Sequence, residues 1–194
     1  FSICNPGAIM PHGLMSVVPF NVMGSDLNQD DKDKRWWSAV YEYNNKYFTG
    51  FAHVTLSGVG CPEMGTLLTM PTMGELNVDY RSYGSEYKDE TARPGYYSTV
   101  LTKYGIRTEV TATTRSSIER YTFPKGKGNL LFHMTGKQAF SFYCRKSGNS
   151  VRLVLRQRPA GMSRERFEWL SQIAGEVIAT PGCESNVKEI FDKT

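Results

Sequence analysis

The chain has 194 residues, and 40% of them are hydrophobic, which is enough to bury the core of one domain or of one domain with an appendage. The formal net charge of +4 is mild, and no nucleic-acid-binding module is recognisable, so nucleic-acid binding is not expected. No stretch is long and apolar enough to span a bilayer, so we expect no membrane span.

Short strands joined by turns are expected over most of the chain, because 11 Tyr, 10 Phe and 18 Gly favour that organisation. The clearest signal lies at residues 106–114, where apolar and polar residues alternate with a period of two. Strands are expected at residues 14–20, 36–43, 47–56, 95–103, 106–114, 117–123, 129–135, 138–146 and 151–155, with a short apolar run at 66–70 ended by Pro71. Residues 36–43 and 47–56 are expected to form a hairpin around Asn44 and Asn45. This series predicts a mainly β fold, an antiparallel β-sandwich.

The pattern changes near Met162, where helical spacing replaces alternation. Ser163 is a possible N-cap for a helix whose apolar positions would be Phe167, Leu170, Ala174, Val177 and Ile178. Thr180-Pro181-Gly182 would end it, and residues 186–193 are a candidate for a last short helix. We therefore expect a β-sandwich domain at residues 1–160 and one or two C-terminal helices in residues 161–194, as a linker or a divergent tail.

The densest group of candidate functional residues lies where a strand carrying His53 runs into a glycine-rich loop. Clustered glycines allow backbone amides to approach a ligand closely. The loop carries Ser57, Gly58, Gly60, Cys61, Glu63 and Gly65. From chemistry alone, the favoured interpretation is a glycine-rich turn with a histidine in the core. Sugar or ligand contact stays open as the alternative.

Trp36 and Trp37 are adjacent, so in a strand they would point to opposite faces. One would pack in the core, and the other would be free to stack on a sugar ring; packing of both is equally open. The acid-rich residues 25–35 lack the spacing of a calcium loop, so we expect them to form a solvated loop. The four cysteines are far apart and show no metal-binding spacing, which leaves disulfides and buried thiols both open.

Four segments in chain order resemble glycoside hydrolase family 92. Residues 5–15, NPGAIMPHGLM, resemble the family's opening NxxPGAxxPFGM pattern, and residues 50–62, GFAHVTLSGVGCP, resemble its GFSHTHLSGTGC signature. Glu86, Ala92 and the run PGYYS at 94–98 resemble its ExAxPGYYxV stretch, and residues 104–124 resemble its GIxxELTATxRxxxHRYTFP run. Three positions depart from these patterns: His12 replaces a common Phe, Thr55 a second His, and Glu119 the His before RYTFP.

The resemblance implies an N-terminal β-sandwich of the galactose-mutarotase-like supersandwich type, packed on a larger (α/α)6 barrel. It also implies calcium-assisted, inverting exo-hydrolysis of α-mannosides in mannose-containing glycans. By the same resemblance, the catalytic acid and base and the calcium ligands belong to the barrel, for which this chain is too short, so no catalytic or metal-ligating residue is expected here. The pocket residues carried over by position are His53, Ser57, Gly58, Gly60 and Cys61, with Trp36 and Trp37 as weaker candidates.

Two other functions stay open beside that of a mannosidase lobe. One is a free-standing carbohydrate-binding β-sandwich, which exposed Trp and Tyr on one sheet face would favour. The other is a structural or interaction domain that has lost sugar recognition, for which the departures at His12 and Thr55 leave room. A periplasmic or secreted location is expected only from the family's digestion of external glycans. After about Gly136 the family motifs end, so the rest is expected to be either a divergent strand with a linker helix or a non-native tail.

Overall fold

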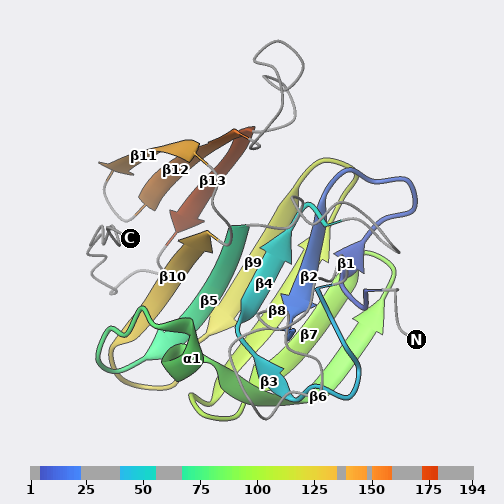
Figure 1. The fold of residues 1–194 in the computed structure, drawn as a ribbon, viewed down its shortest axis with the longest axis vertical. Coiled ribbons are helices and arrows are strands. Elements are labelled where there is room, and N and C mark those ends of the chain that lie inside the picture. Colours follow the sequence, from blue (N-terminus) through green and yellow to red (C-terminus); the bar gives the residue numbers. More distant parts are fainter. Residues whose placement is uncertain are drawn as a thin grey trace. The chain divides into compact units, whose positions relative to one another are not determined.

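The computed structural model describes residues 5–22, 40–55, 67–134, 139–147, 150–158 and 172–178. The chain divides into two compact units, residues 1–136 and 137–194. Among the described residues, the elements are antiparallel strands apart from one short helix (Figure 1). The mainly antiparallel β fold expected from the sequence is therefore confirmed.

One sheet of the first unit, called here the β2 sheet, has the strand order β1-β2-β4-β5-β10. Its strands are β1 (Ala8–Ile9), β2 (Ser16–Phe20), β4 (Gly50–His53), β5 (Leu67–Met73) and β10 (Gly128–Met134). Two prolines lie inside these strands, although a proline cannot donate to a ladder. Pro19 pairs with β4 at a point that the short β1 does not reach, and Pro71 pairs with β10 beyond the start of β4. Both strands therefore continue through their prolines, and β5 extends past Pro71, where the sequence had suggested an end.

The other sheet, called here the β8 sheet, has the order β3-β6-β7-β8-β9. Its strands are β3 (Tyr47–Phe48), β6 (Ser85–Arg93), β7 (Tyr96–Leu101), β8 (Ile106–Ala112) and β9 (Ser117–Thr122). The expected alternation is confirmed in β8, where every second side chain is buried. The helix α1 (Tyr80–Tyr83) precedes β6, and Asp79 caps it by accepting a hydrogen bond from the Arg81 backbone amide.

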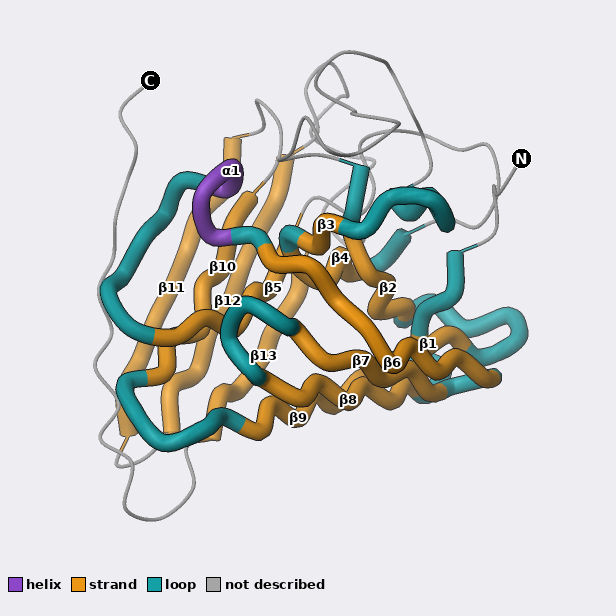
Figure 2. The backbone as a smooth tube through the Cα atoms, turned by 90° about the horizontal axis from the view of Figure 1, so that it is seen from below, coloured by secondary structure: helices purple, strands orange, loops and turns teal. Residues whose placement is uncertain are grey.

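The core of the first unit lies between the two sheets, which Figure 2 shows as two layers. Side chains of both sheets contribute to it: the Phe51 ring of β4 meets the Tyr97 ring of β7 edge to face, with centroids 5.9 Å apart. Phe51 also packs edge to face on Phe48 of β3, at 4.9 Å. Such aromatic pairs add about 0.5–1.5 kcal/mol each beyond the burial of their surface.

The expected hairpin around Asn44 and Asn45 is wrong. Residues 40–43 form no strand, and the expected strand at 47–56 is divided between two sheets, because β3 pairs with β6 whereas β4 pairs with β2 and β5. The chain changes sheet at Gly50, whose φ is 153°. A Cβ atom at this glycine would lie 3.1 Å from the Thr69 carbonyl oxygen, so the close approach of β4 to β5 favours glycine.

The second unit contains a three-stranded sheet with the order β11-β12-β13. Its strands are β11 (Ala139–Ser147), β12 (Ser150–Arg158) and β13 (Gln172–Ile178). The helix expected to continue to Ile178 is wrong over residues 172–178. These residues pair in full register with β12, from Arg156 opposite Gln172 to Ser150 opposite Ile178, and that ladder overrides an apolar spacing compatible with either structure.

The rest of the expected C-terminal helices, residues 163–171 and 186–193, lies outside the described residues. The domain boundary expected between residues 160 and 161 also lies outside them and stays a prediction. The strands β12 and β13, which pair with each other, lie on either side of that boundary.

Candidate functional site

One of the seven pocket residues expected from the sequence, His53, belongs to the described part of the chain. The other six lie outside it, namely Trp36, Trp37, Ser57, Gly58, Gly60 and Cys61. Their contacts with a sugar stay predictions. The described residues therefore define the framework around the expected pocket rather than the pocket itself.

His53 is the last residue of β4, and its side chain is only 6% exposed. Its Nε2 atom lies 2.6 Å from Oε1 of Glu119, and its Nδ1 atom lies 3.2 Å from the Leu67 carbonyl oxygen. Both ring nitrogens therefore have protein partners in this geometry. A hydrogen bond from His53 to a sugar hydroxyl stays a prediction, and it requires the ring to leave one of these partners.

Glu119 lies on β9 in the β8 sheet, so its contact with His53 joins the two sheets. Its second oxygen, Oε2, accepts a hydrogen bond of 2.8 Å from the Thr69 hydroxyl of β5 and another from the Tyr121 hydroxyl of β9. The hydroxyls of Thr69 and Tyr121 also lie 3.1 Å apart. One carboxylate thus collects three side chains from three strands.

The sequence identified Glu119 only as a departure from a motif and Tyr121 only as part of the same motif, and neither as a site residue. A further signal was present in β9, whose pattern is the reverse of an ordinary surface strand. Glu119 and Tyr121 point inward, whereas the apolar Ile118, which precedes Glu119, points outward and is 71% exposed. An acidic residue on the inward face of an alternating strand indicates a buried partner.

The electrostatics favour the charged forms of both His53 and Glu119. Burial lowers the pKa of His53, but the adjacent Glu119 carboxylate and its hydrogen bond outweigh this and leave the pKa above 6.5. For Glu119, burial raises the pKa, but the charge of His53 and three hydrogen bonds outweigh this and leave it below 4.5. The pKa of Tyr121 is raised well above its ordinary value by burial and by Glu119, so its hydroxyl stays protonated and can donate.

The residues that follow His53 are also held tightly. Val54 has a φ of 56°, a left-handed conformation that is unfavourable by about 1–3 kcal/mol for a β-branched residue. Its amide donates to the Ser16 carbonyl oxygen at 3.0 Å, and the Thr55 amide donates to the Ser16 hydroxyl at 2.7 Å. Ser16 of β2 therefore fixes the direction in which the chain leaves β4.

Residues 40–45, the first described residues after Trp36 and Trp37, are anchored to the core. Asn21 holds this segment: the side-chain amide donates to the carbonyl oxygens of Glu42 and Asn45, and its oxygen accepts from the Glu42 amide at 2.8 Å. Asn21 and Asn45 are fully buried. The described end of the segment is thus fixed to the core, whatever the conformation of the two tryptophans.

A second carboxylate, Glu90 of β6, is turned towards the core by a β-bulge. Asp89 has a φ of 54°, and the pairing of β6 with β7 shifts register between Lys88 and Thr91. The Glu90 carboxylate accepts hydrogen bonds from the hydroxyls of Tyr97, at 2.7 Å, and Tyr41, at 3.1 Å. This cluster resembles that of Glu119 in chemistry, but the two hydroxyls that the Glu90 carboxylate binds, those of Tyr97 and Tyr41, belong to neither β4 nor β5.

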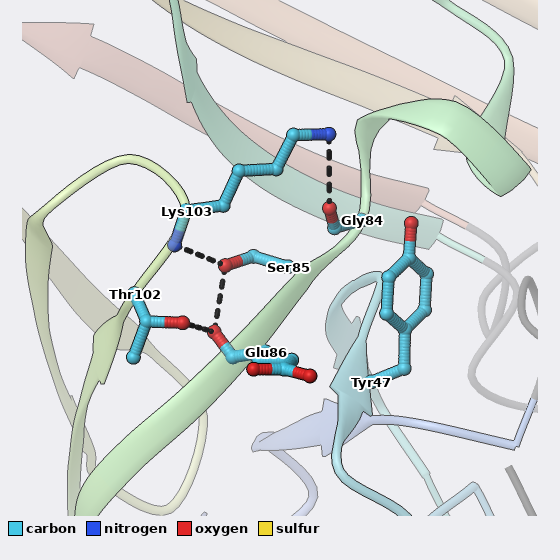
Figure 3. A pocket seen from close by; sticks show the side chains of 6 residues that line it. All are labelled: Tyr47, Gly84, Ser85, Glu86, Thr102 and Lys103. Carbon is cyan, nitrogen blue, oxygen red and sulfur yellow. Dashed lines mark hydrogen bonds between the residues drawn. The ribbon is translucent and has the colours of Figure 1, made fainter. Parts of the chain in front are cut away.

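A hollow of about 340 Å³ lies beside the start of β6 and is lined by Tyr47, Gly84, Ser85, Glu86, Thr102 and Lys103 (Figure 3). Its polar groups bind one another: the Lys103 ammonium donates to the carbonyl oxygens of Ser82 and Gly84, and the Thr102 hydroxyl donates to that of Glu86. The hollow contains none of the pocket residues expected from the sequence, so we do not assign the sugar site to it.

Calcium does not fit the described residues. They contain no group of three or more His, Cys, Asp or Glu side chains that could hold a metal ion. The carboxylates at the core are also already engaged, Glu119 with His53 and Glu90 with two tyrosines. On the outer face, Glu109 of β8 binds Arg120 at 2.7 Å, and its pKa is lowered chiefly by that hydrogen bond.

No helix in the described part of the chain is long and apolar enough to cross a membrane.

The two-sheet architecture and the four motifs together define the β-sandwich domain of a glycoside hydrolase. More specifically, the chain belongs to the glycosyl hydrolase family 92 N-terminal domain family, whose sequence profile matches residues 3–177. The match extends past Gly136, where the motifs end, and covers the three-stranded sheet of the second unit except its last residue, Ile178. No curated protein sequence matches the chain closely enough to count as a relative.

Solved structures of family 92 enzymes resemble this fold. An α-mannosidase of Bacteroides thetaiotaomicron is 25% identical with a TM-score of 0.65, and the alignment covers 81% of this chain and 22% of that one. Its complex with mannoimidazole aligns with a TM-score of 0.64 at 24% identity, over 81% and 21% of the two chains. The family 92 glycosyl hydrolase ccman5 is 25% identical with a TM-score of 0.64, over 81% and 22%. The chain thus spans about a fifth of the length of these enzymes.

Proposed function

We propose that this chain is the N-terminal lobe of an α-mannosidase that hydrolyses mannose-containing glycans. The observation that carries the proposal is the family match over residues 3–177, joined to the likeness to an α-mannosidase of which the chain spans 22%. The catalytic acid and base, and the calcium ligands, are then supplied by an (α/α)6 barrel. A periplasmic or secreted location is part of the same proposal.

The proposed contribution of the lobe is part of the sugar pocket, through Ser57, Gly58, Gly60 and Cys61, with Trp36 and Trp37 beside them. The first four of these residues lie in the connection between β4 and β5, residues 54–66. Support comes from the described residues at both ends of this connection, which are fixed by buried or partly buried hydrogen bonds. A binding loop with fixed ends loses less conformational entropy when a ligand orders it. Cys61 shapes the pocket wall and is not a nucleophile in this proposal.

The lobe is proposed to lack the catalytic pair. An inverting glycosidase needs two carboxyl groups on opposite faces of the sugar, separated by about 6.5–9.5 Å so that a water fits between them. Glu119 and Glu90 are poorly suited to this task, because each already accepts hydrogen bonds inside the core. Glu63, within the connection, lies outside the described residues, and Asp79 caps α1.

The test is mannose release from an α-mannoside by the purified chain, first with calcium and then with a chelator. We expect no release in either condition, together with weak binding of methyl α-mannoside, about millimolar by ligand-observed NMR. Trp36→Ala and Trp37→Ala should reduce that binding. Calcium-dependent release by the chain alone would place the acid and base here and refute the division of labour. Absence of any α-mannoside binding would refute the contribution to the pocket.

A free-standing carbohydrate-binding sandwich is the alternative, and the described aromatic residues give it limited support. The rings of Phe20, Phe48, Phe51 and Tyr97 are buried in the core. Tyr43 is 65% exposed, but the Lys46 ammonium already lies 4.8 Å from its ring centroid. Fusion to the remainder of the Bacteroides enzyme discriminates between the two functions. Restored hydrolysis supports the lobe, whereas tight sugar binding by the isolated chain and no restored hydrolysis support the free-standing binder.

A further inference from the structure

The two ends of the connection between β4 and β5 are tied together by a side chain. The last register pair between these strands is Ala52 with Leu68, so no ladder joins the next residues. His53 takes over at that point: it ends β4, and its Nδ1 atom lies 3.2 Å from the carbonyl oxygen of Leu67, the first residue of β5. The His53 ring therefore bridges the entrance and the exit of the connection.

Glu119 fixes both of these ends from the opposite sheet. One carboxylate oxygen binds Nε2 of His53 at 2.6 Å, and the other accepts the Thr69 hydroxyl of β5 at 2.8 Å. Tyr121, two residues along β9, donates to the same carboxylate and limits its rotation. The side chain of Glu119 is 15% exposed, so water competes little for these contacts.

A second and independent set of contacts acts on the entrance alone. Ser16 accepts hydrogen bonds from the backbone amides of Val54 and Thr55, and Val54 adopts a left-handed φ of 56°. Such a conformation persists in a β-branched residue only when surrounding contacts over-determine it. The direction of the chain is thus specified at three consecutive residues, His53, Val54 and Thr55, where the chain leaves β4 and enters the connection that carries the proposed pocket residues.

We propose that Glu119 is a positioning residue, which acts through His53 and Thr69 to set the ends of the β4–β5 connection and so present its sugar-binding residues. The link between this role and sugar binding rests on the proposed function, whereas the effect of Glu119 on the conformation of the chain does not. Glu119 does not touch the substrate. It replaces the missing ladder between β4 and β5 by directional hydrogen bonds from the other sheet.

The first test is amide hydrogen exchange in the full chain with Glu119→Gln. Its matched control is Glu90→Gln, since Glu90 is also a core-facing carboxylate that accepts tyrosine hydroxyls, but on β6. We expect Glu119→Gln to accelerate exchange at residues 54, 55 and 67–69 by about tenfold or more beyond any global change, because local opening needs fewer broken contacts. In Glu90→Gln, the exchange rates of these amides should change only as much as those of the rest of the first unit.

Two further variants separate positioning from a general loss of packing. Thr69→Val keeps the shape of the side chain and removes one donor to Glu119, so it should reproduce a smaller, equally local effect even if Glu119→Gln fails to fold. Glu119→Asp keeps the carboxylate and should restore part of the protection lost in Glu119→Gln. Uniform acceleration in all variants, or equal effects of Glu119→Gln and Glu90→Gln at residues 54–55 and 67–69, would overturn the proposal.

The second test is binding of methyl α-mannoside by the same variants. We expect affinity to fall about tenfold in Glu119→Gln and to stay unchanged in Glu90→Gln, since a misplaced binding loop must be reordered on binding. Unchanged affinity together with local exchange in Glu119→Gln would overturn the link to sugar. If the wild-type chain binds no α-mannoside, the proposed contribution to the sugar pocket fails, but the exchange experiment still decides whether Glu119 sets the connection.

Discussion

Replacing His53 by leucine tests the energetics of the buried pair directly. The substitution removes the imidazole 2.6 Å from Glu119 and leaves the carboxylate buried with only its two hydroxyl donors. Removing one partner of a buried ion pair destabilises a protein by about 3–5 kcal/mol. Because domains are stable by about 5–15 kcal/mol in total, this loss is a large fraction of the stability of the first unit.

The double variant His53→Leu with Glu119→Leu should be more stable than His53→Leu alone. It leaves no unpaired charge, and the hydroxyls of Thr69 and Tyr121 lie 3.1 Å apart and still satisfy each other. Replacing both members of a buried pair by apolar residues is often neutral or favourable, which predicts a recovery of about 1–4 kcal/mol over the single variant. Urea unfolding followed by far-ultraviolet circular dichroism, with both single variants and the double, gives the coupling energy.

The decisive question is whether the losses of unfolding free energy in the two single variants add up to the loss in the double variant. Additive losses would mean that His53 and Glu119 contribute independently, and the description of the pair as an inter-sheet tie would be refuted. A double variant less stable than either single variant would have the same meaning. A recovery in the double variant would show that the charge left behind, rather than lost packing, causes the effect of His53→Leu.

Three other predictions follow from the described contacts. The stabilisation by the buried pair should be complete between about pH 4.5 and 6.5. It should decline at higher pH as the imidazolium, whose pKa is raised, deprotonates, and at lower pH as the carboxylate, whose pKa is lowered, is protonated. Urea titrations of the double leucine variant at each pH should show neither decline in the unfolding free energy. Gly7→Ala should lower the unfolding free energy by about 3 kcal/mol, because its Cβ would lie 2.6 Å from Cγ2 of Val18, and a loss below the error of a thermal melt would contradict this. Gly84→Ala places a Cβ 2.6 Å from Cζ of Tyr47, so it should destabilise the chain by about 1–3 kcal/mol but have little effect in a Tyr47→Ala background; equal losses in both backgrounds would exclude the clash as the cause.

The strand pattern of the first unit was predictable wherever one face of a strand is buried and the other is wet. β8 is the clear case, because its buried and exposed side chains alternate along the whole strand. β6 was missed for the opposite reason. Its residues 85–93, SEYKDETAR, are mostly exposed, and its bulge at Asp89 breaks the alternation, so no periodic signal marks it as a strand.

The division of residues 47–56 between two sheets was not predictable from local pattern either. Phe48 and Phe51 are both fully buried, and their rings touch, so a single strand and two strands would give similar apolar content. The distinction is made by partners far along the chain: Ser85 for Phe48, and Thr69 for Phe51. Register with a distant strand is not encoded in the residues of the segment itself.

The site shows the same limit more sharply. The sequence led to His53 because it lies in a recognisable motif, and the two interpretations left open were a core histidine and a sugar contact. The described geometry agrees with the first, since both ring nitrogens bind protein atoms. Glu119 is 66 residues away on the other sheet, so only the fold brings the two together.

A buried ion pair is a poor choice if stability alone is selected, because apolar side chains of similar size serve as well or better. Its distinguishing property is direction: a carboxylate with three donors holds each of them at a defined angle, which an apolar contact does not. Direction matters most where a ladder ends, and the ladder between β4 and β5 ends at Ala52 and Leu68. His53 and Glu119 begin to act at the next residue. The pair is therefore placed where it controls how the chain enters and leaves the connection that carries the proposed pocket residues.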